Sequence, residues 1–193
     1  MVNKMSSPTL TNPVSVQDLL IIREVYRELR IERSDVLGEL PHGTKWLRIR
    51  YLKTGTVRTL ASVSFDPPTL SIHRYAFDYP HPLLLKGLLH HEMLHLSLGS
   101  ELGHQPTYRR IESEWDRYDE YHDHRKRFVK FVEAKEIKAG RLREYKCRNC
   151  NSVIYRKRKL DSNSACTKCC DLFNNGNYSE TYSFITVGIS GKD

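Results

Sequence analysis

The run LLLKGLLHHEMLHLSLG, at residues 83–99, constrains the fold more than any other stretch of the chain. It is apolar enough to form a buried helix, yet it contains three histidines and a glutamate. In a helix, His91 and His95 lie on one face, one turn apart, and Glu92 lies beside them. Because burying these groups without partners is costly, the run is expected to form the floor of a binding site.

The pentapeptide HEMLH within this run has the HExxH pattern. Two imidazoles with this spacing can share a zinc ion, and Glu92 can accept a proton from water. A catalytic zinc usually has three protein ligands, and the candidates for the third in the following segments are His104, Glu112 and His124. His90 points about 100° away from the pair and is expected at the surface or behind the site.

Upstream of this helix, the pattern predicts a first helix and then a small sheet. Ser15 is a typical N-cap for a helix with apolar residues at helical spacing. Short strands follow within residues 47–72, separated by turn sequences at 53–55 and 66–68. They predict a three-stranded antiparallel sheet whose last strand, TLSIH, borders the cleft where an extended substrate could pair.

The domain layout follows from these elements and from a change in composition. Another helix is expected from Gln105 at least through Phe128, which completes an α+β metallopeptidase domain over residues 15–137. Residues 1–14 are polar and contain proline, so they are expected to be a disordered lead. Paired cysteines and basic residues mark residues 138–193 as a small β zinc ribbon followed by a tail.

The cysteines predict a second metal site, of a closed structural type. Four of the five have the spacing C-x2-C-x15-C-x2-C, which is typical of two zinc knuckles that share one ion. Cys170 is left over by this spacing, although it could replace its neighbour. The four expected ligands are Cys147, Cys150, Cys166 and Cys169.

The positive charge of the chain is concentrated beside these cysteines. The formal net charge is +8, and residues 125–160 contain 14 Lys or Arg against 3 Glu. Such a block indicates a polyanionic partner such as a nucleic acid, with a merely solvated face or a plain structural ribbon as the alternatives. Six residues are expected to contact DNA, four through phosphates and two tyrosines by base stacking: Arg156, Lys157, Arg158, Lys159, Tyr145 and Tyr155.

Three motifs occur in the order of a known family: HEMLH, then GHQPTY at residues 103–108, then the two CxxC pairs. In these motifs, residues 15–170 resemble the SprT-like zinc metalloproteases, which include proteases of DNA–protein crosslinks. The resemblance implies that His104 is the third zinc ligand and that a zinc ribbon follows the protease domain. The chain departs from the family pattern at Asn151 and Cys170, where glycine is common after a knuckle.

Together these features predict a zinc-dependent endopeptidase with one catalytic and one structural zinc, in which Glu92 is the general base. Tyr108 and His73 are guesses for the group that stabilises the oxyanion. The alternatives are a nucleic-acid-binding zinc protein with an idle or structural HExxH site, and a zinc hydrolase that acts on other bonds. The expected partners are a protein substrate and DNA, for a monomer in the cytoplasm, or in the nucleus of a eukaryote, without a membrane segment.

Overall fold

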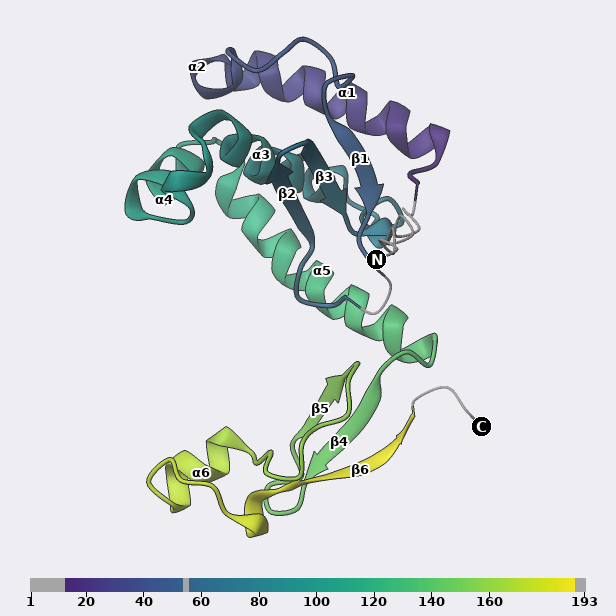
Figure 1. Cartoon of the computed structure of the whole chain (residues 1–193), viewed down its shortest axis with the longest axis vertical. Coiled ribbons are helices and arrows are strands. Elements are labelled where there is room, and N and C mark those ends of the chain that lie inside the picture. Colours follow the sequence, from purple (N-terminus) through teal and green to yellow (C-terminus); the bar gives the residue numbers. More distant parts are fainter. Residues whose placement is uncertain (1–12, 54–55, 190–193) are drawn as a thin grey trace, which may run out of the picture. The chain divides into compact units, whose positions relative to one another are not determined.

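The computed structural model describes residues 13–53 and 56–189, which belong to two compact units (Figure 1). The first unit ends at Phe128 and the second begins at Val129, inside helix α5 (Tyr118–Lys138). The sequence placed the boundary later, after residue 137. Most of the predicted N-terminal lead, residues 1–12, lies outside the described residues, as do residues 54–55 of the predicted turn. No helix in the described part of the chain could span a membrane.

The first unit begins with the predicted helix, α1 (Val16–Glu32). The Ser15 hydroxyl accepts a hydrogen bond from the backbone N–H of Asp18 at 3.1 Å, which confirms it as the N-cap. A short helix, α2 (Ser34–Leu37), follows. Three fully buried residues fix the inner face of α1: Ile22, Tyr26 and Leu29.

Helix α3 (Pro82–Leu98) is the centre of the first unit. It packs against α1, α2, strand β2 (Ala61–Phe65) and helix α4 (Pro106–Ser113). Its leucines up to Leu94 are buried on several sides, which explains why this part of the run is apolar around the helix. The helix begins at a proline and ends before Gly99, as the sequence predicted.

The sheet of the first unit is mixed, so the predicted antiparallel meander is wrong. Strand β3 (Pro68–Ile72) lies in the middle and pairs parallel with β1 (Arg48–Tyr51) and antiparallel with β2. A tight turn joins β2 to β3, but a longer connection separates β1 from β2, so these two strands form no hairpin. The TLSIH segment therefore contributes the central strand, and β2 is an edge strand, as is β1.

The long helix predicted after Gln105 is broken into two, which corrects a second expectation. Helix α4 ends at Ser113 and α5 begins at Tyr118. Trp115 lies in the break, where it is 4 % exposed and packs on the His90 ring at a centroid distance of 4.6 Å. The break thus lets a large aromatic side chain fill the space behind α3. Short 3-10 segments, η1 (Arg74–Ala76) and η2 (Ser100–Leu102), flank α3.

The second unit contains a three-stranded antiparallel sheet in the order β5-β4-β6. Its elements, with the C-terminal end of α5, are β4 (Arg143–Cys147), β5 (Val153–Arg156), α6 (Thr167–Phe173), η3 (Glu180–Tyr182) and β6 (Phe184–Ile189). Its small core is formed by cysteines, with Tyr182 and Phe184 packed around them. A small unit whose buried cluster consists of cysteines is typical of folds stabilised by a metal ion.

Candidate active site and metal centres

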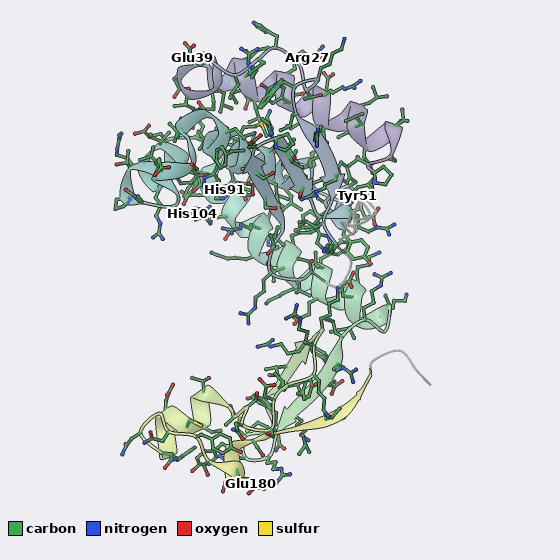
Figure 2. The ribbon with its side chains drawn as sticks, in the orientation of Figure 1. Arg27, Glu39, Tyr51, His91, His104 and Glu180 are labelled. Carbon is green, nitrogen blue, oxygen red and sulfur yellow. The ribbon has the colours of Figure 1, made fainter. Side chains whose placement is uncertain are left out.

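Three histidine side chains meet at the C-terminal end of α3. The Nε2 atom of His104 lies 3.2 Å from Nε2 of His91 and 3.1 Å from Nε2 of His95. Figure 2 shows His91 and His104 close together. Nitrogen ligands about 2.1 Å from one ion in a tetrahedral arrangement are about 3.4 Å apart. The three histidines therefore fit around a single metal ion and could hold one.

The loop after α3 brings His104 back to the helix. Gly99 and Gly103 have φ values of 84° and 48°, in a region that side chains rarely adopt. Between them, η2 forms a single tight turn, so the chain reverses direction within a few residues. The GHQPTY segment thus lies beside HEMLH, as the third-ligand prediction requires.

Glu112 of α4 lies behind His91 and outside the three-histidine group. Its Oε1 accepts a hydrogen bond from Nδ1 of His91 at 2.7 Å, and its side chain is 7 % exposed. Burial is the largest single influence and would raise the pKa of Glu112, but the hydrogen bond from His91 and the charges of the neighbouring histidines together lower it. The carboxylate fixes the His91 ring so that Nε2 faces His104 and His95. Glu112 is therefore hydrogen-bonded to one of the candidate ligands and lies outside their group.

Two of the three histidines, His95 and His104, have lowered pKa values that favour the neutral form that binds metal ions. Burial, together with the neighbouring imidazoles of His91 and His104, lowers the pKa of His95 to about 4. Burial also lowers the pKa of His104, the most exposed of the three. A neutral imidazole keeps a free lone pair for a metal, so no proton has to be displaced near neutral pH.

Glu92 lies next to His91 on α3, at the bottom of a cleft of about 380 Å³. The residue is only 5 % exposed, and burial raises the pKa of Glu92 to about 7. The nearby His91 and Arg125 oppose this shift without cancelling it. A carboxyl group with a pKa near 7 suits proton transfer at neutral pH, because it can both accept and release the proton.

The cleft has one wall made by an edge strand. β2 and the residues before it form this wall, and its floor is made by the three histidines, Glu92 and Leu88. Tyr121 and Arg125 of α5 also line it. An extended chain laid along β2 would therefore run past the histidines.

The two guesses for an oxyanion-stabilising group do not agree with the structure. The Tyr108 hydroxyl donates to the backbone carbonyl of His91 at 2.7 Å, and the ring is fully buried against His95. Nε2 of His73 lies 2.9 Å from the carbonyl oxygen of Thr56, and the residue is 3 % exposed. Both groups are already used in holding the fold, and neither lines the cleft.

His90 is buried, so the part of its prediction that placed it at the surface is wrong. It is fully buried, its Nε2 lies 3.1 Å from Nη1 of Arg33, and its ring packs on Trp115. Burial and the Arg33 charge lower the pKa of His90 to about 3, so the ring stays neutral. The residue ties α3 to the end of α1 and to the break between α4 and α5.

His124 lies apart from the three-histidine group. It belongs to α5 and forms a different cluster with His81 and Glu120. The prediction that kept it as an alternative third ligand is therefore not supported by its position, whereas His104 lies beside His91 and His95.

The second unit brings four cysteines together. The Sγ atoms of Cys147 and Cys169 are 3.8 Å apart, and those of Cys150 and Cys166 are 3.7 Å apart. Four sulfurs about 2.3 Å from one tetrahedral ion would be about 3.8 Å apart, so the cluster could hold a metal ion. All five cysteines are free thiols, and Cys170 lies outside the group.

Local backbone geometry supports this arrangement of thiols. Asn151, after the first pair, has φ 59°, the left-handed conformation that asparagine tolerates in place of glycine.

Hydrogen bonding with Ser152 lowers the pKa of Cys150 to about 6, whereas burial raises the pKa of Cys166 to about 12. Of the two, Cys150 therefore forms the thiolate more readily near neutral pH.

The residues predicted to bind DNA differ in exposure. Lys157, Arg158 and Lys159 are exposed, whereas Arg156 is half-buried. Tyr155 is half-buried on β5 and remains a candidate for stacking. The same prediction for Tyr145 is wrong.

Tyr145 is 3 % exposed, so its ring is not available to a base. Its hydroxyl accepts a hydrogen bond from the backbone N–H of Leu160 at 3.1 Å. The side chain therefore belongs to the inner face of the sheet.

Two functional candidates were missed by the sequence analysis. Arg125 was counted only as part of the basic block, but it lines the cleft near Glu92. The wall of the cleft was assigned to TLSIH, whereas β2 forms it. Neither could be found from local patterns, because both depend on how distant segments pack.

In comparisons with known proteins, no family model, no curated protein and no solved structure matches this chain.

Proposed function

We propose that this protein is a zinc-dependent endopeptidase of the SprT-like type, which cleaves proteins bound or crosslinked to DNA. One observation carries the proposal. Three imidazoles converge within one cleft, Glu92 lies beside them, and an edge strand forms the wall. Each part has a separate role in hydrolysing a peptide bond.

His91, His95 and His104 would hold the catalytic zinc, and Glu112 would orient His91 through its hydrogen bond. When bound, zinc supplies a Lewis acid that polarises a carbonyl and makes water easier to deprotonate. Zinc suits this ligand set because three imidazoles leave a fourth tetrahedral position open.

Glu92 accepts the proton of the attacking water and later passes it to the leaving amine. Its position beside His91 and its pKa near 7 suit both steps. Arg125 stands across the same cleft, where its positive charge would favour the negative charge that develops on the carbonyl oxygen. We assign the electrostatic role to Arg125 in place of the two earlier guesses.

Substrate would bind as an added strand on β2. In the sheet order β1-β3-β2, one edge of β2 is not paired by another strand of the described sheet. A polypeptide in extended form can hydrogen-bond along such an edge, which aligns its backbone and leaves its side chains free. This mode selects unfolded or flexible chains over one particular sequence.

The second unit would hold the structural zinc and bind DNA. A four-thiolate site with zinc carries a charge of about −2, which the surrounding lysines and arginines exceed. Arg158 and Lys159 extend into solvent after β5, where they can reach phosphates. Tyr155, opposite Glu144 on the neighbouring strand, is the remaining candidate for base stacking.

The proposal is tested by cleavage of a DNA-bound protein and, in parallel, of a free unstructured peptide. Both should be cut, a chelator should stop both reactions, and added zinc should restore them. Replacing Arg158 and Lys159 by Ala should slow only the DNA-bound reaction and reduce the salt dependence of DNA binding, by about 0.7–0.9 log units per log unit of salt for each lost contact. Replacing exposed Arg23 and Lys45 by Ala is the matched control.

If the zinc-restored protein cuts neither the DNA-bound protein nor the free peptide, the peptidase proposal is contradicted. Cleavage of the free peptide without measurable DNA binding would leave the peptidase and remove DNA from the account.

A further inference from the structure

A second cluster of metal-binding side chains lies at the other end of α3. His81 is the residue before the helix, and Glu120 and His124 lie one turn apart on α5. One potential ligand atom from each lies within 4.8 Å of the other two. At about 1.5 Å of helix rise per residue, His81 is about 15 Å along α3 from His91. The cluster is therefore separate from the candidate active site.

The three side chains are already in mutual contact. The rings of His81 and His124 are stacked, with centroids 3.7 Å apart and planes at 21°. Nε2 of His81 lies 4.0 Å from Oε1 of Glu120. The other oxygen of Glu120, Oε2, accepts hydrogen bonds from Arg117, so Oε1 is the oxygen left facing the histidines.

Two nitrogens in this cluster have no polar partner within the described residues. Nδ1 of His81 and Nδ1 of His124 are both shielded from solvent and accept or donate no hydrogen bond there. Buried polar atoms are nearly always paired, so an unpaired nitrogen on each ring requires an explanation. A ligand shared by the two rings supplies one.

We propose that His81, Glu120 and His124 form a further metal site, which takes a divalent transition-metal ion such as zinc or copper. Two imidazoles and one carboxylate are a ligand set that suits these ions and disfavours calcium and magnesium. Because the rings are nearly parallel, one of them turns out of the stack when both nitrogens bind the ion. A stacking contact is weak beside a metal–nitrogen bond.

The charges around the cluster are compatible with a cation. Burial and the neighbouring His81 lower the pKa of His124, so its imidazole is neutral and free to bind. Arg127 disfavours a cation, whereas Asp123 and Glu120 favour one. Both the start of α3 and the start of α5 disfavour positive charge through the helix dipole, and the Glu120 carboxylate offsets this.

An ion at this place would connect the start of α3 to α5. Tyr79 supports the same contact, because its ring packs edge-on against both His124 and Phe128. The bound ion should therefore raise the thermal stability of the first unit. It should leave the ligands of the candidate active site unchanged.

The test is a zinc titration of the full chain, followed by competition with a chromophoric chelator. The unsubstituted protein should bind one more zinc ion than His124→Ala or His81→Ala. Glu120→Gln should bind the extra ion at least about tenfold more weakly, and either imidazole loss should weaken it by about 100-fold or more. His42→Ala, which removes another exposed histidine, should leave the extra ion bound.

Equal zinc content and affinity in the unsubstituted protein and in the His81 and His124 variants would overturn the proposal. If those variants do not fold, histidine-ring NMR of the unsubstituted protein decides the question. Zinc added beyond the high-affinity sites should shift the His81 and His124 ring signals together, and unmoved signals would equally overturn it.

Discussion

Glu112 offers a sharp prediction, because it touches a proposed ligand without being one. Its Oε1 is 2.7 Å from Nδ1 of His91, and the side chain is 7 % exposed. Glu112→Ala leaves a buried N–H without a partner and frees the ring to rotate. Loss of a partner of this kind typically costs about 10–100-fold in metal affinity, which is about 1.4–2.7 kcal/mol.

Glu112→Gln should have a smaller effect than Glu112→Ala. An amide oxygen can still accept the hydrogen bond, but the charge that strengthens it is lost. We expect a decrease in zinc affinity of about tenfold for Gln and about 100-fold for Ala. The assay is competition for zinc between each variant and a chromophoric chelator of known affinity. Glu114→Gln, two residues further on and exposed, is the matched control and should change nothing.

Two results would refute this reasoning. Unchanged zinc affinity in Glu112→Ala would show that the hydrogen bond does not orient His91. Complete loss of the catalytic zinc in Glu112→Ala, together with its retention in His104→Ala, would show that Glu112 is itself the third ligand.

Three other predictions concern the cleft. Gly87→Ala places a Cβ 2.0 Å from Cδ2 of buried Tyr121, where carbon contacts are normally about 3.5–4.0 Å. The cost of this overpacking is partly offset by the higher helix propensity of alanine. The free energy of unfolding, measured by urea denaturation, should therefore fall by about 1–2 kcal/mol. Arg125→Ala should lower kcat with little change in KM. Arg127→Ala, also exposed on α5, is the control and should leave kcat unchanged. Equal decreases in kcat for the two variants would argue against the role assigned to Arg125. Activity should rise with pH through a limb between about pH 5 and about pH 7, because Glu92 must be ionised to accept a proton and the charge of bound zinc would move its pKa down from the value of about 7. A profile that is flat over this range would contradict the prediction.

Features coded by neighbouring residues were predictable from the sequence. Ser15 caps α1 because a hydroxyl at that position can reach the N–H three residues later, whatever the rest of the fold does. Gly99 ends α3 because its backbone adopts a positive φ. The facing histidines and the paired cysteines follow from helix period and knuckle spacing in the same local way.

Features that depend on distant contacts were not predictable. The parallel pairing of β1 with β3 depends on how the chain packs after the loop between β1 and β2. The alternation of residues within a strand does not indicate which other strand it pairs with. The break before Tyr118 accommodates the packing of Trp115 on His90, and these two residues are far apart in the sequence. Tyr145 has the composition of a stacking residue, but its place on the inner face of β4 buries it.

Arg125 shows the same limit in the site itself. In the sequence it is one positive charge among fourteen in the basic block. Only the packing of α5 beside α3 places it in the cleft with Glu92.

The most direct test of the central claim compares Glu92→Gln with the unsubstituted protein for zinc content and peptide cleavage. Glu92 is a neighbour of the three imidazoles and is not one of them, so the variant should keep its zinc and its melting temperature. It should nevertheless lose cleavage by about 100-fold or more, because the group that accepts the proton is gone. Glu101→Gln, in the exposed loop after α3, is the control and should cleave normally. A zinc-loaded Glu92→Gln variant that cleaves at the unsubstituted rate would contradict the account.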